Sequence, residues 1–314
     1  MQKYGNMGRK YPVAEKNPYI YIRILIVCYT MRKLVFTSVL LFLTGFSCFA
    51  EGVLEKEDTL KVAAIPDDSY YEQTQKQRFP VFGQFKETYF ITGIPTNTTS
   101  VDKHNADIRF QVSLALRLAR TENVDILGTY TENGVWNVYD KSNPLVENAF
   151  SPGLCVYWFA DPQWDFMFGI SHQSNGYVNE KSRSVNTAYA TAIYSPVKEF
   201  QIGGKVWYGY YEHIPGLPHY FKRRGFGEVW ATYRAFDNRL NITALVNPSN
   251  TFKNYNLEFN LSYRLSEKGT FLPSIFAQYR QGYCETLKNF NTYEAHFRVG
   301  FALELKHGYN SSIH

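Results

Sequence analysis

Long apolar runs are missing from most of this chain of 314 residues. A transmembrane helix needs about 20 consecutive apolar residues, and no such run exists beyond residue 50. Cysteine is also scarce, and only Cys155 and Cys284 lie beyond that point. Their spacing is not that of zinc ligands, and it leaves open whether the two form a disulfide. Residues 51–314 are therefore neither a helical membrane protein nor a cysteine-bound zinc module.

The one apolar run of note lies near the N-terminus. Met31, Arg32 and Lys33 precede the apolar residues 34–46. The segment Cys48-Phe49-Ala50 follows, with the small residues Cys48 and Ala50 at the positions expected before a cleavage site. This layout is typical of a secretory signal peptide cleaved after Ala50, and the apolar core is short for the competing interpretation, a membrane anchor. We expect residues 1–50 to be an upstream extension and signal peptide, with the mature chain starting near Glu51.

Excess charge of either sign is absent from the mature chain. The whole sequence has 33 Lys and Arg against 28 Asp and Glu, and residues 1–50 hold seven of the former and one of the latter. The remainder has a net charge of −1, so no basic surface argues for a nucleic-acid partner. Residues 51–84 carry many charges and few apolar positions, which predicts a periplasmic lead-in without its own core.

What the sequence does contain is period-two alternation from residue 85 onward. In residues 108–116, 255–265 and 293–305, every second side chain is large and apolar, the pattern of a strand with one apolar face. This alternation predicts twelve strands, most of them longer than the usual five or six residues of soluble strands. They span residues 85–94, 105–120, 124–136, 150–160, 163–175, 183–196, 198–213, 225–236, 238–248, 254–265, 270–282 and 293–306.

The connections between these strands alternate in length. They are tight after even-numbered strands, as at residues 121–123, and mostly long after odd-numbered strands, as at 137–149. Short turns on one side and long loops on the other are typical of an outer-membrane barrel. We therefore predict an all-β fold, a twelve-stranded antiparallel transmembrane β-barrel over residues 85–306, with a C-terminal tail at 307–314. A secreted β-sandwich also alternates, but strand length and loop asymmetry favour the barrel.

One predicted strand, 163–175, carries chemistry at its end. Its apolar face holds Trp164, Phe166, Phe168 and Ile170, and the same face continues with His172 and Ser174. In a barrel this face is turned to lipid. Because odd-numbered strands run toward the long loops, we expect the pair at the outer-leaflet boundary.

The residue types suit nucleophilic catalysis. Residues two apart on a strand point the same way, so His172 can reach the hydroxyl of Ser174 and act as its base. The base needs a third group to orient it, and Asn186 lies on the returning strand. A neutral amide suits a site that borders hydrocarbon, where an unpaired carboxylate is costly. A His-x-Ser pair in a polar hairpin is by itself common in ordinary turns, so the longer pattern decides.

That longer pattern resembles the outer-membrane phospholipase A family. The matching positions are His172, Ser174, Asn175 and Gly176, followed after the family's usual gap by Ser182, Arg183, Ser184 and Asn186. The likeness extends to residues 110–115, to Leu127, Gly128, Tyr130 and Thr131, to Ser142, Pro144 and Glu147, and to residues 282–287. It covers residues 85–305.

The resemblance implies a calcium-dependent phospholipase of the outer membrane that hydrolyses acyl esters of glycerophospholipids (A1, A2 and lysophospholipase activity), with its active site at the outer leaflet. It implies Ser174 as nucleophile, His172 as general base and acid, and Asn186 as the orienting residue. The backbone N–H of Gly176 would belong to an oxyanion hole. For Ca²⁺ it implies Ser142, the backbone carbonyl of Tyr177, and Ser182, and it implies a homodimer when active.

Three positions depart from the family pattern. Tyr177 stands where arginine is typical, Gln173 replaces an acidic residue, and Val185 replaces tryptophan. A non-enzymatic barrel, either a small pore or a structural protein, is the alternative function. A stripe of Ala188, Ala190 and Ala192 on the Asn186 face is compatible both with close packing of a partner or acyl chain and with ordinary lipid-facing filler.

Overall fold

The computed structural model describes residues 78–142, 145–213, 220–269 and 271–305. The predicted signal peptide at 1–50, most of the lead-in at 51–84, and the tail at 307–314 lie outside the described residues. In the part of the chain that is described, no helix is both long and apolar enough to cross a bilayer.

Thirteen antiparallel strands make up the sheet, with the short helix α3 and a 3₁₀ turn, η1, in its connections. Their bounds are β1 Phe82–Gln84, β2 Thr88–Pro95, β3 Asp107–Arg120, β4 Val124–Trp136, β5 Leu145–Phe159, β6 Trp164–Ser174, η1 Asn179–Lys181, β7 Ser184–Val197, β8 Phe200–His213, α3 Tyr220–Arg224, β9 Gly227–Ala235, β10 Leu240–Pro248, β11 Tyr255–Arg264, β12 Phe271–Gly282 and β13 Glu294–Leu305.

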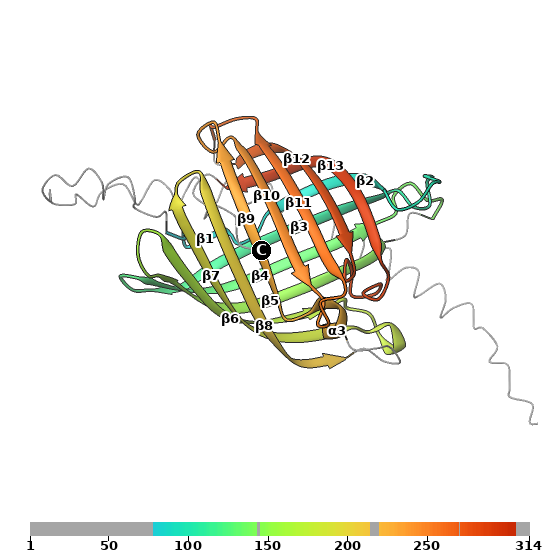
Figure 1. The fold of residues 1–314 in the computed structure, drawn as a ribbon, viewed down its shortest axis with the longest axis horizontal. Helices are drawn as coiled ribbons and strands as arrows, with labels where there is room; N and C mark the ends of the chain where they lie inside the picture. The colour runs from blue at the N-terminus through green and yellow to red at the C-terminus, as the bar shows by residue number, and fades with distance from the viewer. Residues whose placement is uncertain (1–77, 143–144, 214–219, 270, 306–314) are drawn as a thin grey trace, which may run out of the picture. The chain divides into compact units, whose positions relative to one another are not determined.

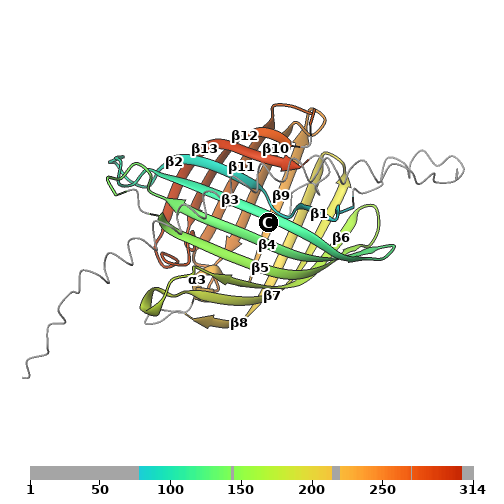
Figure 2. The same ribbon diagram turned by 180° about the vertical axis from the view of Figure 1, so that it is seen from behind.

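The sheet closes on itself. Strand β2 pairs with β3 on one side and with the last strand, β13, on the other. Each strand from β3 to β12 is also hydrogen-bonded to the strand that follows it in the chain. The strands wrap around a common interior in both ribbon views (Figures 1 and 2). Strand β1 pairs with residues 114–116 of β3, and β2 pairs with residues 107–111 of the same strand. Strands β1 and β2 therefore occupy one position in the ring, which has twelve positions. The predicted twelve-stranded antiparallel barrel is confirmed, and its closure rules out a sandwich.

The barrel begins earlier than the predicted residue 85. Strand β1 lies within the segment assigned to the lead-in, and Phe79 before it is buried. The Gln84 side chain is also buried and accepts a hydrogen bond from the Leu305 amide at 3.1 Å. A polar side chain that faces the interior is not recognised by a search for large apolar residues at every second position. For this reason the sequence pattern predicted the first strand too late.

Side-chain polarity is inverted relative to a soluble protein. Large apolar side chains such as Leu118, Phe168 and Ile170 are exposed on the outer wall, while polar ones are buried inside. Inside the barrel, the Ser113 and Thr131 hydroxyls lie 2.7 Å apart and hydrogen-bond. This is the arrangement expected of a barrel with a lipid-facing outer wall and a polar interior.

The connections show the predicted asymmetry. One end of the barrel has turns at 121–123, 160–163, 198–199, 236–239 and 265–270. The other end has the connections 96–106, 137–144, 175–183, 214–226, 249–254 and 283–293, most of them longer. Strand β6 runs toward this second end, so residues 172–183 lie there.

A buried ion cluster ties three parts of the barrel interior together. Arg298 on β13 donates to both carboxylate oxygens of Asp107 at 2.7 and 2.6 Å, and to Glu285 at 2.7 Å. Its side chain is only 1% exposed. Removal of one partner from such a cluster leaves buried charges without compensation.

We expect Arg298→Ala to lower the free energy of unfolding by about 3–5 kcal/mol, because it leaves Asp107 and Glu285 short of positive charge in the interior. Denaturant unfolding of the protein in detergent or lipid checks this. The matched control is Arg239→Ala, which removes an exposed pair with Glu267 and is expected to leave the midpoint unchanged. Equal effects of the two variants would contradict the role assigned to the cluster.

Candidate active site

The register between β6 and β7 places His172 directly opposite Asn186. The Nδ1 atom of His172 and Oδ1 of Asn186 lie 2.5 Å apart. His172 is exposed, and Ser174 and Asn186 are half-buried. All three belong to the outward face that also presents Phe168 and Ile170, so the three residues predicted as a triad share the outer wall at this end of β6.

The contact between His172 and Asn186 determines what the imidazole can do. An amide oxygen only accepts, so the hydrogen between the two atoms belongs to Nδ1. In the neutral form of the ring, the other nitrogen, Nε2, then carries the lone pair. Ser174 follows two residues later on the same face of β6, so the imidazole and a hydroxyl share the outer end of the strand.

Gly176 follows the serine in a backbone conformation that favours glycine. Its φ is +65°, and a Cβ there would lie 3.3 Å from Cε2 of Phe150. Its backbone N–H points toward the Ser174 hydroxyl and donates to Oγ at 3.4 Å, a long and weak hydrogen bond. A backbone donor is therefore positioned beside the serine oxygen.

Asn175 organises the hairpin around Gly176. Its side chain is 5% exposed, and its Oδ1 accepts from the amides of Arg183 at 3.0 Å and Tyr177 at 3.3 Å. Its Nδ2 donates to the carbonyl of Lys181 at 3.1 Å. The sequence motif contained Asn175, but no role was predicted for it. An Asn before Gly is a signal for side-chain-to-backbone bonding in a turn, and that signal could have identified it.

The three predicted calcium ligands lie on two connections at the same end of the barrel. Ser142 is exposed between β4 and β5, and Tyr177 and Ser182 lie between β6 and β7. No hydrogen bond of the described residues uses the carbonyl of Tyr177 or the hydroxyl of Ser182. These oxygens remain available for a ligand.

The donor set at this end is neutral. Among the described residues, no three or more His, Cys, Asp or Glu side chains cluster in a way that could hold a metal ion. A cation bound here would be held by hydroxyl and carbonyl oxygens and by water, which are ligands that Ca²⁺ accepts. The residues present therefore fit Ca²⁺, and they do not fit a metal that prefers nitrogen or sulfur ligands.

Tyr177 also contacts the neighbouring strand. Its phenol donates to the carbonyl of Val146 at 3.3 Å. Burial, together with the charge of Glu147, raises the pKa of this phenol above its usual range. The hydroxyl of the ring therefore stays protonated and acts as a donor that links the hairpin to β5.

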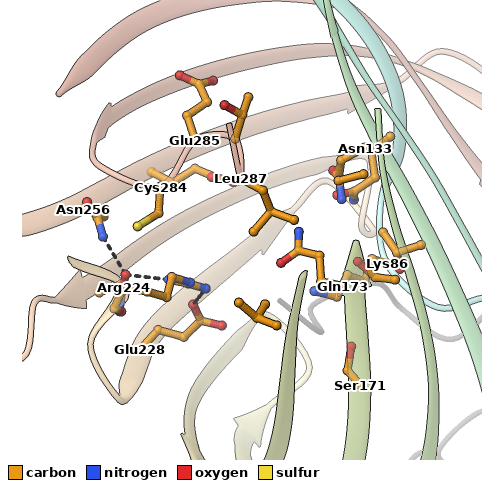
Figure 3. A pocket seen from close by; sticks show the side chains of 18 of the residues that line it. Lys86, Asn133, Ser171, Gln173, Arg224, Glu228, Asn256, Cys284, Glu285 and Leu287 are labelled. Carbon is orange, nitrogen blue, oxygen red and sulfur yellow. Dashed lines mark hydrogen bonds and ion pairs between the residues drawn. The ribbon is translucent and has the colours of Figure 1, made fainter. Parts of the chain in front are cut away.

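The interior side of the same strands lines a different space. Ser171, Gln173 and Val185 face a cavity of about 290 Å³ inside the barrel. Figure 3 shows Ser171 and Gln173 there, with Leu287 from the last long connection. His172, Ser174 and Asn186 do not line this cavity. Two of the three departures from the family pattern, Gln173 and Val185, thus lie on the opposite side of the wall from the triad.

Cys155 and Cys284 are free thiols and form no disulfide.

Comparisons with known proteins agree with this arrangement. The family model for phospholipase A1 matches residues 70–303. The phospholipase A1 of Escherichia coli is 25% identical over 210 residues, which cover 63% of this chain and 69% of that protein. The Salmonella typhimurium enzyme is 25% identical over 223 residues, covering 67% and 74%.

Solved structures show the same fold. Outer membrane phospholipase A from Escherichia coli superposes with a TM-score of 0.62 at 21% identity, covering 72% of this chain and 99% of that one. The Salmonella typhi outer membrane phospholipase, solved as a dimer with bound calcium, gives a TM-score of 0.62 at 21% identity and covers 77% and 100%. At this identity the likeness is one of fold.

The contact with Asn186 predicts a single tautomer for His172. In the neutral form of the ring, we expect its proton on Nδ1 and not on Nε2. Nitrogen chemical shifts of the labelled imidazole measure this. Asn186→Ala should convert the signal to a mixture of tautomers, whereas Ser151→Ala, on the inner side of β5, should leave it unchanged. A predominant Nε2–H form in the unsubstituted protein would contradict the assignment.

Proposed function

This chain belongs to the phospholipase A1 family, and we propose that it cleaves acyl esters by a serine mechanism in which Ser174, His172 and Asn186 act together. Family membership and the closed barrel make it an integral outer-membrane phospholipase. The observation that carries the proposed mechanism is the 2.5 Å contact between His172 and Asn186 beside Ser174. The proposed substrates are diacyl glycerophospholipids, cleaved at either position, and their lysophospholipid products.

In the proposed reaction, Nε2 of His172 takes the proton from Ser174 as Oγ attacks the ester carbonyl. The resulting imidazolium still donates from Nδ1 to Asn186, which keeps the ring oriented. The same proton then passes to the departing glycerol oxygen, which leaves an acyl-serine. Water attacks this acyl group with His172 again as base, and the fatty acid is released.

The oxyanion formed in each attack needs a donor that is already in place. The N–H of Gly176 is positioned for this role, because it already points at the oxygen of Ser174. A preorganised backbone donor acts strongly in a site with little water. Any side chain at position 176 would strain the φ of +65° and shift this donor.

A calcium ion is the proposed cofactor, held by Ser142, the carbonyl of Tyr177, and Ser182. When bound, it would supply positive charge beside the acyl carbonyl and help to stabilise the oxyanion. The neutral donor set described above supports this choice of ion, as does the calcium-bound state of the Salmonella typhi relative. Arginine at position 177 is not required if only the backbone carbonyl binds.

We propose a homodimer as the active state, with its interface on the outer wall around the site. The outward residues of β6 and β7 support this. Ala188, Ala190 and Ala192 lie in register with Ile170, Phe168 and Phe166, so the wall is apolar here and its β7 side chains are small. The Salmonella typhi relative is a dimer. Because the site is at the long-loop end, its proposed substrate lies in the outer leaflet.

Ser174→Ala should abolish hydrolysis of detergent-dispersed phospholipid, with a loss of at least about 10³-fold, because the substitution removes the oxygen of the proposed nucleophile. Fatty-acid release by purified protein with added calcium measures this. Ser171→Ala is the matched control: Ser171 is on the same strand but faces the interior, so activity should persist. Undiminished activity in Ser174→Ala, or none in the unsubstituted protein, would favour a non-enzymatic barrel.

Calcium should be required and bound weakly. A site without carboxylates is expected at the weak end of protein calcium affinities, about 10⁻⁴–10⁻³ M, and Ser182→Ala should raise the calcium concentration needed for half-maximal activity. Activity should disappear with a chelator and return when calcium is added back. Full activity in excess chelator would exclude the metal from the mechanism, and Ser266→Ala, at the other end of the barrel, serves as the control.

A further inference from the structure

The hairpin 175–183 between β6 and β7 contains a buried charge that the mechanism above does not use. Arg183 is only 8% exposed. The hydrogen bonds that its guanidinium makes within the described residues go to backbone carbonyls and not to a carboxylate, and its Nε atom has no partner in this part of the chain. A buried charge without a counter-ion is costly, so the contacts that it does make require an explanation.

Arg183 holds two carbonyl groups of its own hairpin. Its Nη1 atom donates to the carbonyl of Glu180 at 2.5 Å and to the carbonyl of Ser182 at 2.9 Å. Because arginine presents its donors in a rigid planar fork, the two carbonyls are held in a fixed relation to each other.

These contacts complete the fixation of Ser182, one of the proposed calcium ligands. Its backbone N–H donates to the carbonyl of Asn179 at 3.0 Å, and its carbonyl accepts from Arg183. With both backbone groups held, the position of the Ser182 hydroxyl depends on rotation about χ1, which has three preferred values.

Asn175 joins a second proposed ligand, Tyr177, to the same unit. Its Oδ1 accepts from the backbone amides of Tyr177 at 3.3 Å and Arg183 at 3.0 Å. Its own backbone N–H donates to the carbonyl of Arg183 at 3.1 Å. The protein itself therefore ties together the two backbone segments that carry these ligands.

The same contacts decide which oxygens of the hairpin are left for a cation. The carbonyls of residues 179–183 all accept hydrogen bonds from within the hairpin. No hydrogen bond of the described residues uses the carbonyl of Tyr177 or the hydroxyl of Ser182. Calcium binds oxygen ligands of both kinds, so the hairpin offers it these two.

We propose that Arg183 is a positioning residue for the calcium ion, which keeps the Ser182 hydroxyl in place by fixing the backbone around it. This inference rests on the function proposed above. Arg183 does not bind the ion in this role, because its positive charge repels a cation. Residues that orient metal ligands without touching the metal typically change its affinity by about 10–100-fold.

The test is Arg183→Lys in the full-length protein, because lysine keeps the charge but lacks the planar fork. Titration calorimetry with calcium chloride should show a Kd that is higher by about 10-fold. At saturating calcium, kcat should stay within about twofold, because Asn175 still holds the backbone at Gly176. The matched control is Arg117→Lys at the tight-turn end, where Nη1 donates to the carbonyl of Phe79 at 2.5 Å; its Kd for calcium should be unchanged.

A second substitution separates positioning from charge. If Arg183 acted only as a charge near the ion, Arg183→Gln would bind calcium more tightly and Arg183→Lys would bind it unchanged, and this result overturns the proposal. Should Arg183→Lys fail to fold, Arg183→Gln alone decides, with weaker calcium binding in support and unchanged or tighter binding against. In a Ser182→Ala background, Arg183→Lys should cause little further loss of affinity, whereas additive losses would contradict an action through Ser182.

Amide hydrogen exchange without calcium tests the hairpin directly. Arg183→Lys should speed exchange at the amide of Ser182 and leave Ala188 on β7 unchanged, and an unchanged rate at Ser182 would overturn the proposal. If the unsubstituted protein binds calcium but hydrolyses no phospholipid, the proposed function fails, and the calorimetric comparison still decides the role of Arg183. If it hydrolyses phospholipid but binds no calcium, the role of Arg183 fails and Ser174→Ala still tests the serine mechanism.

Discussion

Backbone hydrogen bonding constrains everything else in this molecule. In the hydrocarbon of a bilayer, each peptide N–H and C=O must find its partner within the protein, which a sheet achieves only by closing. Here the closing seam is the pairing of β2 with β13, from His296 opposite Pro95 to Leu303 opposite Thr88. Once the ring is closed, each residue's position along its strand decides whether its side chain meets lipid or the interior.

The site depends on this parity. With His172 opposite Asn186, both side chains are on the outer face; a slip of one residue would turn one of them inward. The two faces then follow different electrostatic rules. The interior contains full charges, such as Arg298 with Asp107 and Glu285, because each is paired there. On the outer wall, where an unpaired charge would face hydrocarbon, the carboxylate of Glu132 in the row of Ser174 accepts hydrogen bonds from Asn148 and Tyr130, and the third residue of the proposed triad is a neutral amide.

Much of this was predictable from sequence because the signals are local. Strands follow from period-two alternation, and Ser174, His172 and Asn186 lie within a single hairpin, so strand pairing alone brings them together. The exceptions involve interior polar groups or distant partners. The polar Gln84 made the first strand of the barrel hard to recognise in the sequence. Glu147 accepts a hydrogen bond from the amide of Leu287, which lies 140 positions later in the sequence. No local sequence pattern predicts that the connection 283–293 folds inward. Its position depends on the packing of its side chains and on an ion cluster whose members come from several strands.

Because Ser174 and His172 face outward, the supply of substrate to this site is not described by a concentration in bulk water. A site inside the lumen would sample solutes from water, and its occupancy would depend on their bulk molarity. A site on the outer wall samples its neighbours within the plane of the membrane. Its supply is a surface density, set by the lipid composition of one leaflet and by lateral diffusion. Two copies with the same affinity for substrate would then work at different rates in membranes of different composition.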